Sequence, residues 1–279
     1  MKTEEKYRAG IPDTRRIVIK VGSRVLVQKN GRPDTRRMRT LVNEIARLRH
    51  DGKDVVLVTS GAIAAGMQTL KMRERPTKLP DLQMAAAVGQ TRLMSLYTDM
   101  FAAKGCIIGQ ILLTSDNFEQ RMRTTNAKRT IENLLRNGVV PIINENDAIT
   151  DEEIRADLVL GDNDLLATLV SKLIRADLML LLTTADGVRA PSTRGRTKRV
   201  SFIEDVNRKV MRLVTPDDNS LSKGGMASKL HAARDAAKSG CIAIIANGRV
   251  TGTIGRVMKG EDVGTIVLSA LKQHRRSGA

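Results

Sequence analysis

Short runs of β-branched and aliphatic residues recur along the chain and alternate with longer amphipathic segments. Runs of about four to eight such residues, bounded by turn-forming residues, are typical of buried strands. The sequence therefore predicts strands at Ile17 to Ile19, Val55 to Thr59, Ile107 to Thr114, Val139 to Ile143, Leu178 to Thr183, Ile242 to Ala246 and Thr265 to Leu268.

The segments between these runs carry apolar residues at helical spacing, at Met38, Leu41, Ile45 and Leu48 and again at 131, 134 and 135. Strands that alternate with helices indicate crossover units, in which the strands are parallel and helices cover both faces of the sheet. The expected fold class is α/β, a three-layer α-β-α sandwich with a mostly parallel central sheet.

The organisation expected along the chain is one continuous unit with two functional halves, divided near Leu160. Residues 1–15 are polar and predict a loose N-terminal extension. Two further segments, Pro76 to Pro80 and the basic stretch Pro191 to Arg199, are interpreted as loops or mobile hairpins.

The net charge of +17 leaves a polyanionic partner open, because such a charge attracts phosphates. The basic residues are dispersed, however, and aromatic residues make up only 2% with no Trp, so base stacking has little support and a nucleic-acid-binding role is disfavoured.

Cys106 and Cys241 each follow a glycine and precede an apolar run, which predicts reduced thiols buried at strand starts. With neither a signal peptide nor a long apolar run, a soluble cytoplasmic protein is expected.

Two polar clusters, Asn144-Glu145-Asn146-Asp147 and Asp162-Asn163-Asp164, follow the middle of the chain. The first comes directly after a run of β-branched residues, where an α/β protein presents side chains at the carboxyl edge of its sheet. Solvated turns are the alternative, since Asn, Asp and Gly are ordinary turn residues. Two clusters in one chain favour a binding site.

Three glycine-containing segments could bind anions. Lys20 ends the first strand and precedes Gly22, although alone it could be an ordinary surface lysine. Ser60-Gly61-Ala62 opens a helix, where free N–H groups attract anions and where Ser60 could instead be an N-cap. The last segment is a glycine turn before Lys229, spanning residues 222–229. The sequence has no G-x-x-x-x-G-K-[ST], G-x-G-x-x-G or G-x-S-x-G motif.

Together these segments resemble the amino acid kinase family, and most specifically its branch that phosphorylates glutamate. The resemblance covers about residues 16–270, in the family's order. Its motifs are Ile17 to Gly22, Val58-Thr-Ser-Gly-Ala-Ile-Ala-Ala-Gly66, Gln83-Met-Ala-Ala-Ala-Val-Gly-Gln90, Leu112-Leu-Thr114, Pro141-Ile-Ile-Asn-Glu-Asn-Asp147, Gly161-Asp-Asn-Asp164, Leu180-Leu-Leu-Thr183 and Gly224-Gly-Met-Ala-Ser-Lys229.

The resemblance implies transfer of the ATP γ-phosphoryl group to the side-chain carboxylate of L-glutamate, with Mg²⁺ held through ATP phosphates and water. Lys20 and Lys229 would flank the transferred group, and Asp164 would hold both lysines. Glutamate would be bound by Ser60, Gly61, Ala62, Asn144, Asn146, Asp147, Asp162 and Asn163. ATP would be bound by Lys20, Gly22, Ser23, Thr183, Thr184, Lys223, Gly224, Gly225, Met226, Ala227, Ser228 and Lys229.

The sequence departs from the family's usual pattern at three places, all on the nucleotide side. Thr183-Thr184 replaces Thr-Asp, Lys223-Gly224-Gly225 replaces Thr-Gly-Gly, and Val188-Arg-Ala-Pro-Ser192 replaces Tyr-x-x-Asp-Pro. The resemblance also implies a homo-oligomer and proline as a feedback inhibitor. Residues 16–272 are expected to form the kinase domain, without the C-terminal PUA domain of many relatives. Acceptors used by other kinases of this fold (aspartate, acetylglutamate, carbamate or uridylate) remain the alternative.

Overall fold

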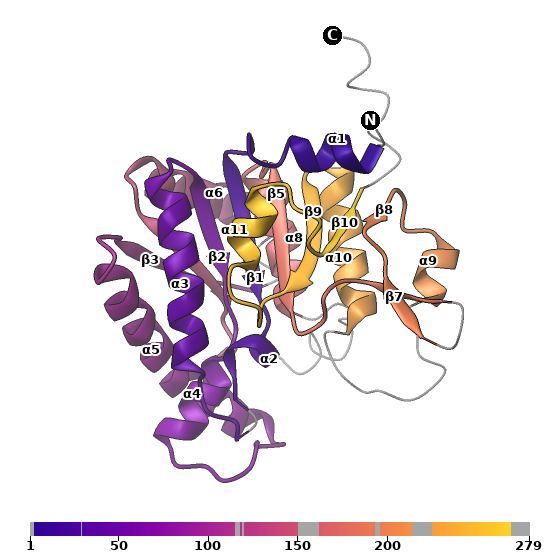
Figure 1. Ribbon diagram of the computed structural model, residues 1–279. Helices are drawn as coiled ribbons and strands as arrows, with labels where there is room; N and C mark the ends of the chain where they lie inside the picture. Colours follow the sequence, from indigo (N-terminus) through magenta and orange to yellow (C-terminus); the bar gives the residue numbers. More distant parts are fainter. Residues whose placement is uncertain are drawn as a thin grey trace. The chain divides into compact units, whose positions relative to one another are not determined.

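A computed structural model describes residues 3–28, 30–114, 118, 120–149, 162–192, 196–213 and 225–268 (Figure 1). The chain divides into two compact units. Unit 1 consists of Met1–Lys20 and Val159–Ala279, and unit 2 consists of Val21–Leu158. The first strand therefore belongs to the same unit as the C-terminal half of the chain. No described helix is both long and apolar enough to cross a bilayer.

Unit 2 contains three parallel strands in the order β3-β4-β2. Every residue of the middle strand β4 is buried, as its run of β-branched residues predicts. The predicted strands near 55, 107 and 139 are confirmed, each to within two residues at its start. The elements of unit 2 are α2 (Ser23–Leu26), α3 (Thr35–His50), β2 (Asp54–Val58), α4 (Ala62–Thr69), α5 (Leu79–Ala102), β3 (Ile108–Leu113), α6 (Arg121–Arg136) and β4 (Val140–Glu145).

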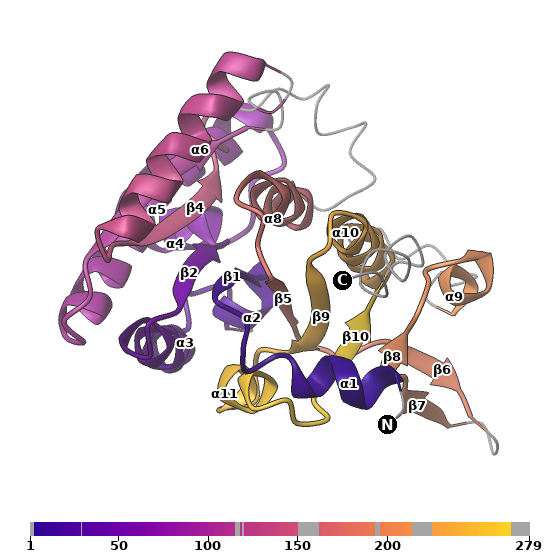
Figure 2. The same ribbon diagram turned by 90° about the horizontal axis from the view of Figure 1, so that it is seen from above.

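The helices of unit 2 bury the apolar faces that the sequence predicts. Met38, Leu41, Ile45 and Leu48 are buried on α3, which begins after Asp34, whose side chain accepts a hydrogen bond from the Arg37 N–H. Figure 2 shows α3 and α6 on opposite sides of β2 and β4. Unit 2 therefore has strands between two layers of helices.

Among the described strands of unit 1, five lie side by side in the order β1-β5-β9-β10-β8, and β6 and β7 form a separate two-stranded sheet. Strands β5 and β9 are parallel, whereas β10 is antiparallel to β9. Helices α8 and α10 cover one face of these strands, and α1 and α11 lie on the other (Figure 2). The elements are α1 (Thr3–Ala9), β1 (Arg16–Val21), α8 (Asp162–Leu173), β5 (Leu178–Thr183), β6 (Arg189–Pro191), β7 (Thr197–Arg199), β8 (Phe202–Ile203), α9 (Arg208–Arg212), α10 (Met226–Lys238), β9 (Ile242–Asn247), α11 (Thr253–Met258) and β10 (Thr265–Val267).

The fold class is confirmed: strands that are mostly parallel lie between helices in an α/β, three-layer arrangement. The cysteine prediction is confirmed as well, because Cys106 and Cys241 are buried, form no disulfide and lie just before β3 and β9. The basic segment near 191–199 contributes the antiparallel pair β6–β7. The short strand β8 is an addition that the sequence did not predict.

The expectation of a loose N-terminal extension is wrong for the described part of that segment. Residues Thr3–Ala9 form helix α1, and the side chain of Ile11, just after it, is fully buried. Arg8 is also buried, and the rings of Tyr7 and Phe202 lie 6.3 Å apart. The polar composition was misleading because Glu4 and Arg8 form hydrogen bonds within unit 1, although Glu5 and Lys6 remain exposed.

Candidate active site

A buried charge cluster in unit 1 is formed by Lys20, Asp164 and Lys229. Lys20 lies near the end of β1, whereas Asp164 and Lys229 lie in the first turns of α8 and α10. The Lys20 Nζ is 2.6 Å from Asp164 Oδ1, and the Lys229 Nζ is 3.0 Å from Asp164 Oδ2. One carboxylate therefore binds two ammonium groups that are distant in sequence.

All three side chains of this cluster are shielded from solvent. Asp164 is 0% exposed, and Lys20 and Lys229 are each 6% exposed. This burial corrects the interpretation of Lys20 as an ordinary surface lysine. Burying charges is tolerated only when they are paired, and here the two lysines are paired through one acid. The three groups together carry a net charge of +1, which favours an anion beside them.

The electrostatics of Asp164 follow from its two partners. Burial alone would raise the pKa of its carboxyl group, but the ammonium groups of Lys20 and Lys229 outweigh that effect and hold the pKa below its ordinary value. Asp164 is therefore ionised at neutral pH. The Ser228 hydroxyl lies within 3.1 Å of Asp164 Oδ2 and within 2.9 Å of the Gly225 carbonyl, so it can donate to either.

The residues predicted to bind ATP lie at strand and helix ends. Thr183 ends β5 and pairs in register with Asn247, and Thr184 after it is exposed. Gly225 precedes α10 without a side-chain cap, so the first N–H groups of this helix can bind an anion. Met226 and Ala227 are partly exposed in the same turn, and in unit 2 the partly exposed Gly22 precedes α2, with Ser23 exposed at its start. Lys223 and Gly224 lie outside the described residues.

Unit 2 contains a cavity of about 210 Å³ at the carboxyl ends of its strands. The predicted cluster contributes Glu145, Asn146 and Asp147 to its lining, and Ala62 from α4 lines it as well. The remaining lining residues include Gln90 from α5 and Gln110 from β3. A small cavity with acid, amide and main-chain groups has the chemistry expected for an amino-acid ligand.

Asn144 lies at the end of β4, where it is 1% exposed and does not line the cavity directly. Its Nδ2 donates to Gln90 Oε1 over 2.9 Å. This bond fixes the orientation of a glutamine that does line the cavity. Asn144 is therefore connected to the cavity through its hydrogen bond to Gln90.

The turn from β2 into α4 depends on glycines. Gly61 adopts φ +106° at the N-cap of α4, a left-handed conformation that other residues rarely adopt, so Ser60 is not the cap. A Cβ on Gly66 would lie 1.8 Å from the Ala85 carbonyl oxygen, and one on Gly89 would lie 1.8 Å from that of Ala62. The two glycines therefore allow α4 and α5 to pack backbone to backbone beside the cavity.

A second support for this turn comes from Tyr97 on α5, which is fully buried. Its hydroxyl lies 2.8 Å from Oγ1 of Thr59, which is the residue before Ser60. Ser60 itself is 8% exposed. The pair of hydroxyl groups ties the end of β2 to α5.

Comparisons with known proteins identify the family of this chain. The model of the amino acid kinase family matches residues 15–247. The chain belongs to the amino acid kinase family. It is 42% identical over 275 residues to a glutamate 5-kinase of Moorella thermoacetica, covering 98% of this chain and 71% of that protein. A glutamate 5-kinase of Clostridium acetobutylicum is 39% identical, over 96% of this chain and 98% of its own length.

Two solved structures show the same fold at low sequence identity. The carbamate kinase from Giardia lamblia has a TM-score of 0.64 at 17% identity, over 92% of this chain and 99% of its own. The UMP kinase from Bacillus anthracis has a TM-score of 0.59 at 16% identity, over 92% of this chain and 97% of its own. Both likenesses concern the amino acid kinase fold alone.

The structure distributes the predicted residues of this family member over both units. Ser60, Gly61, Ala62, Asn144, Asn146 and Asp147 belong to unit 2, whereas Asn163 is partly buried on α8 in unit 1, and only the backbone of Asp162 is described there. Sequence reasoning assigned no role to Gln90, Tyr97 or Gln110. Gln90 lay within a quoted motif, but only the packing of α5 shows that it reaches the cavity.

Proposed function

We propose that this protein transfers the γ-phosphoryl group of ATP to the side-chain carboxylate of L-glutamate, giving L-glutamyl 5-phosphate, the first step of proline biosynthesis. The observation that carries the proposal is the pairing of Lys20 and Lys229 on the two oxygens of Asp164, in a chain about 40% identical to glutamate 5-kinases.

The chemistry of the acceptor explains why a cationic centre is enough. A glutamate side chain has a pKa of about 4.3, so it is already a nucleophilic anion at neutral pH and needs no general base. The difficulty is to bring an anion to a polyphosphate and to stabilise charge on the transferred group. Lys20 and Lys229 provide that stabilisation, and Asp164 orients both. The N–H groups of the first turn of α10 bind phosphate oxygens.

Magnesium fits the same centre as a companion of ATP. Asp164 is already engaged by two ammonium groups, so the ion would take its oxygen ligands mainly from ATP phosphates and water, as Mg²⁺ commonly does. Its contribution is to neutralise phosphate charge. In our proposal, Thr183, Thr184 and the start of α10 hold the nucleotide, with Gly22 and Ser23.

Glutamate binds the cavity of unit 2 in this proposal. Ala62 lines the cavity at the start of α4, and with Ser60 and Gly61 before it would present the helix N-terminus to a carboxylate. Asn146 and Asp147, which also line the cavity, would provide oxygen atoms for the α-ammonium group. Ser60→Ala and Asp147→Ala should therefore raise the KM for glutamate with little change in the KM for ATP. Unchanged glutamate KM values in both variants would remove these residues from the pocket.

An ATP-dependent hydroxamate assay decides the acceptor. Glutamate, aspartate, acetylglutamate and carbamate are offered in parallel, and uridylate phosphorylation is followed by ADP release. Turnover with glutamate alone supports the proposal, and preference for another acceptor contradicts it. Inhibition by proline and self-association are proposed from the family resemblance, and competition against glutamate and sedimentation velocity test them.

A further inference from the structure

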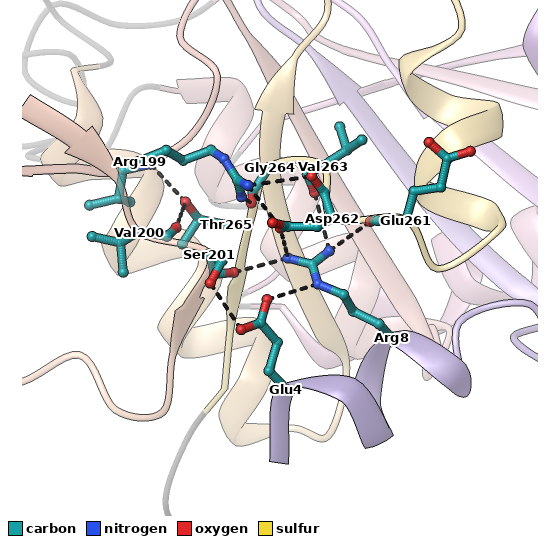
Figure 3. A network of polar contacts seen from close by, with 11 residues as sticks. Glu4, Arg8, Arg199, Val200, Ser201, Glu261, Asp262, Val263, Gly264 and Thr265 are labelled. Atoms are coloured by element: carbon teal, nitrogen blue, oxygen red, sulfur yellow. Dashed lines mark hydrogen bonds and ion pairs between the residues drawn. The ribbon is translucent and has the colours of Figure 1, made fainter. Parts of the chain in front are cut away.

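Arg8 on helix α1 is the centre of a polar network that joins several connections of unit 1 (Figure 3). Its side chain is 8% exposed, although arginine is mostly solvated in proteins. The network shares no residue with the Lys20–Asp164–Lys229 cluster. Its members are Glu4, Arg8, Arg199, Val200, Ser201, Glu261, Asp262, Val263, Gly264 and Thr265.

The guanidinium group of Arg8 uses all three of its nitrogens. Nε donates to Glu4 Oε1 at 2.9 Å, and Nη1 donates to the Glu261 carbonyl at 2.8 Å. Nη2 donates to the Ser201 carbonyl at 3.2 Å and pairs with Asp262 Oδ1 at 2.9 Å. A single side chain thus binds the connection before β8 and the connection before β10, which gives it more geometric control than a lone surface ion pair.

The backbone of α1 is fitted to the same connection. Gly260 has φ +74°, and a Cβ there would lie 2.4 Å from the Arg8 carbonyl oxygen. Glu4 adds a second link, because its Oε2 accepts a hydrogen bond from the Ser201 hydroxyl at 2.9 Å. Helix α1 is therefore docked by side chains and by close backbone packing.

Asp262 connects Arg8 to the β6–β7 hairpin through a second ion pair, with Arg199. Its Oδ1 is shared by Arg8 and by Arg199 Nη2, at 2.9 Å and 2.8 Å. Arg199 is the last residue of β7 and also donates to the Gly264 carbonyl. The buried Thr265 hydroxyl accepts from the Val188 N–H at 2.8 Å and lies 2.6 Å from the Val200 carbonyl, so it holds both ends of the hairpin.

The hairpin continues directly from the end of β5. Only residues 184–188 separate β5 from β6, and Gly187 within them adopts φ +142° against Thr265, where a Cβ would lie 2.4 Å from the hydroxyl oxygen. The hairpin is therefore joined to Thr183 and Thr184 by a short segment that packs closely against Thr265 at Gly187.

We propose that Arg8 is a positioning residue for nucleotide binding, which acts through Asp262 and Arg199 to fix the β6–β7 hairpin and the end of β5. The inference rests on the proposed function, which assigns Thr183 and Thr184 to ATP. It gives the N-terminal helix a role in the affinity for the nucleotide, and none in the binding of glutamate.

The test compares the full chain with its Arg8→Ala and Arg8→Lys variants, by steady-state kinetics and by calorimetric titration with ATP. Arg8→Ala should raise the KM and Kd for ATP between about twofold and thirtyfold, the range over which residues away from a site change binding. The KM for glutamate should stay unchanged. Arg8→Lys should lie in between, because lysine can keep the ion pair with Asp262 but not the fork of contacts.

Two controls separate positioning from general destabilisation. Val170→Ala shortens a fully buried side chain on α8, outside the network, and lowers stability without touching it. Arg256→Ala removes the exposed ion pair of Arg256 with the Glu261 side chain and leaves the contact between Arg8 and the Glu261 carbonyl in place. Both should keep the ATP affinity of the parent.

Each outcome of the test has one meaning. An unchanged ATP affinity in Arg8→Ala, an equal rise of both KM values, or the same loss of ATP affinity in Val170→Ala overturns the inference. A parent enzyme that does not phosphorylate glutamate contradicts the proposed function instead. In that case the ATP titrations of parent and Arg8→Ala still decide the role of Arg8.

Discussion

Replacing Asp164 by asparagine should destabilise the protein far more than removing either lysine does. The change keeps the size of the side chain but removes the negative charge between two buried ammonium groups. The three groups carry +1 in the parent, +2 in Asp164→Asn and 0 in Lys20→Met. Breaking a buried pair by removing one partner costs about 3–5 kcal/mol, so Asp164→Asn should lose about that much.

Lys20→Met should lose about 1 kcal/mol or less, because Asp164 and Lys229 remain as a neutral pair and a desolvated charge is removed. Urea unfolding at pH 7, followed by circular dichroism, measures both variants against the parent. A similar loss in the two variants, or a loss below about 1 kcal/mol in Asp164→Asn, would refute this reasoning about buried charge. Both variants should lose most of their turnover, so only stability separates them.

Further predictions concern the helix pair beside the cavity and the titration of the acid. Gly66→Ala should lower the free energy of unfolding by at least about 1–3 kcal/mol and raise the KM for glutamate, because its Cβ would meet the Ala85 carbonyl. The control Gly255→Ala, which has open space around the new Cβ, should not lower Tm. Tyr97→Phe removes the hydrogen bond with Thr59 and should lower the free energy of unfolding by about 1 kcal/mol. An unchanged melting temperature would contradict this. The folded-state pKa of Asp164 lies below its unfolded value. The ionised carboxylate therefore contributes to the free energy of unfolding above about pH 3.9, and this contribution is lost as the pH falls further. The difference in unfolding free energy between parent and Asp164→Asn should therefore stay constant from pH 7 to about 5 and shrink only below about 4.

The strands were predictable because their information is local. A run such as Val139 to Ile143 has to be buried wherever it lies, and parallel strands buried on both faces read as continuous apolar segments. Helix α3 was equally clear, since its apolar residues recur at helical spacing. The N-terminal helix was not predictable in this way, because Arg8 is stabilised by carbonyl groups that lie far along the chain, at Ser201 and Glu261.

Sequence motifs selected the candidate site residues, but only the structure gives their surroundings. The burial of Lys20 depends on α8 and α10, which come from the other end of the chain. Gln90 and Tyr97 reach the cavity and the β2–α4 turn only because Gly66 and Gly89 let α4 and α5 approach closely. Such contacts depend on tertiary packing and leave no periodic pattern in the sequence.

A lysine at the end of an otherwise apolar strand breaks the rule that makes that strand easy to predict. The apolar run Ile17 to Ile19 predicts a buried strand, and Lys20 directly after it is also buried, with 6% exposure. Proteins depart from consistent patterns mainly at functional sites, where stability is given up for chemistry. The positive charge that should destabilise Asp164→Asn is, in our proposal, the charge that attracts a phosphate group in the parent. In the structure, two buried lysines that share one carboxylate are a more specific indication of function than the glycine turns, because turns have many other uses.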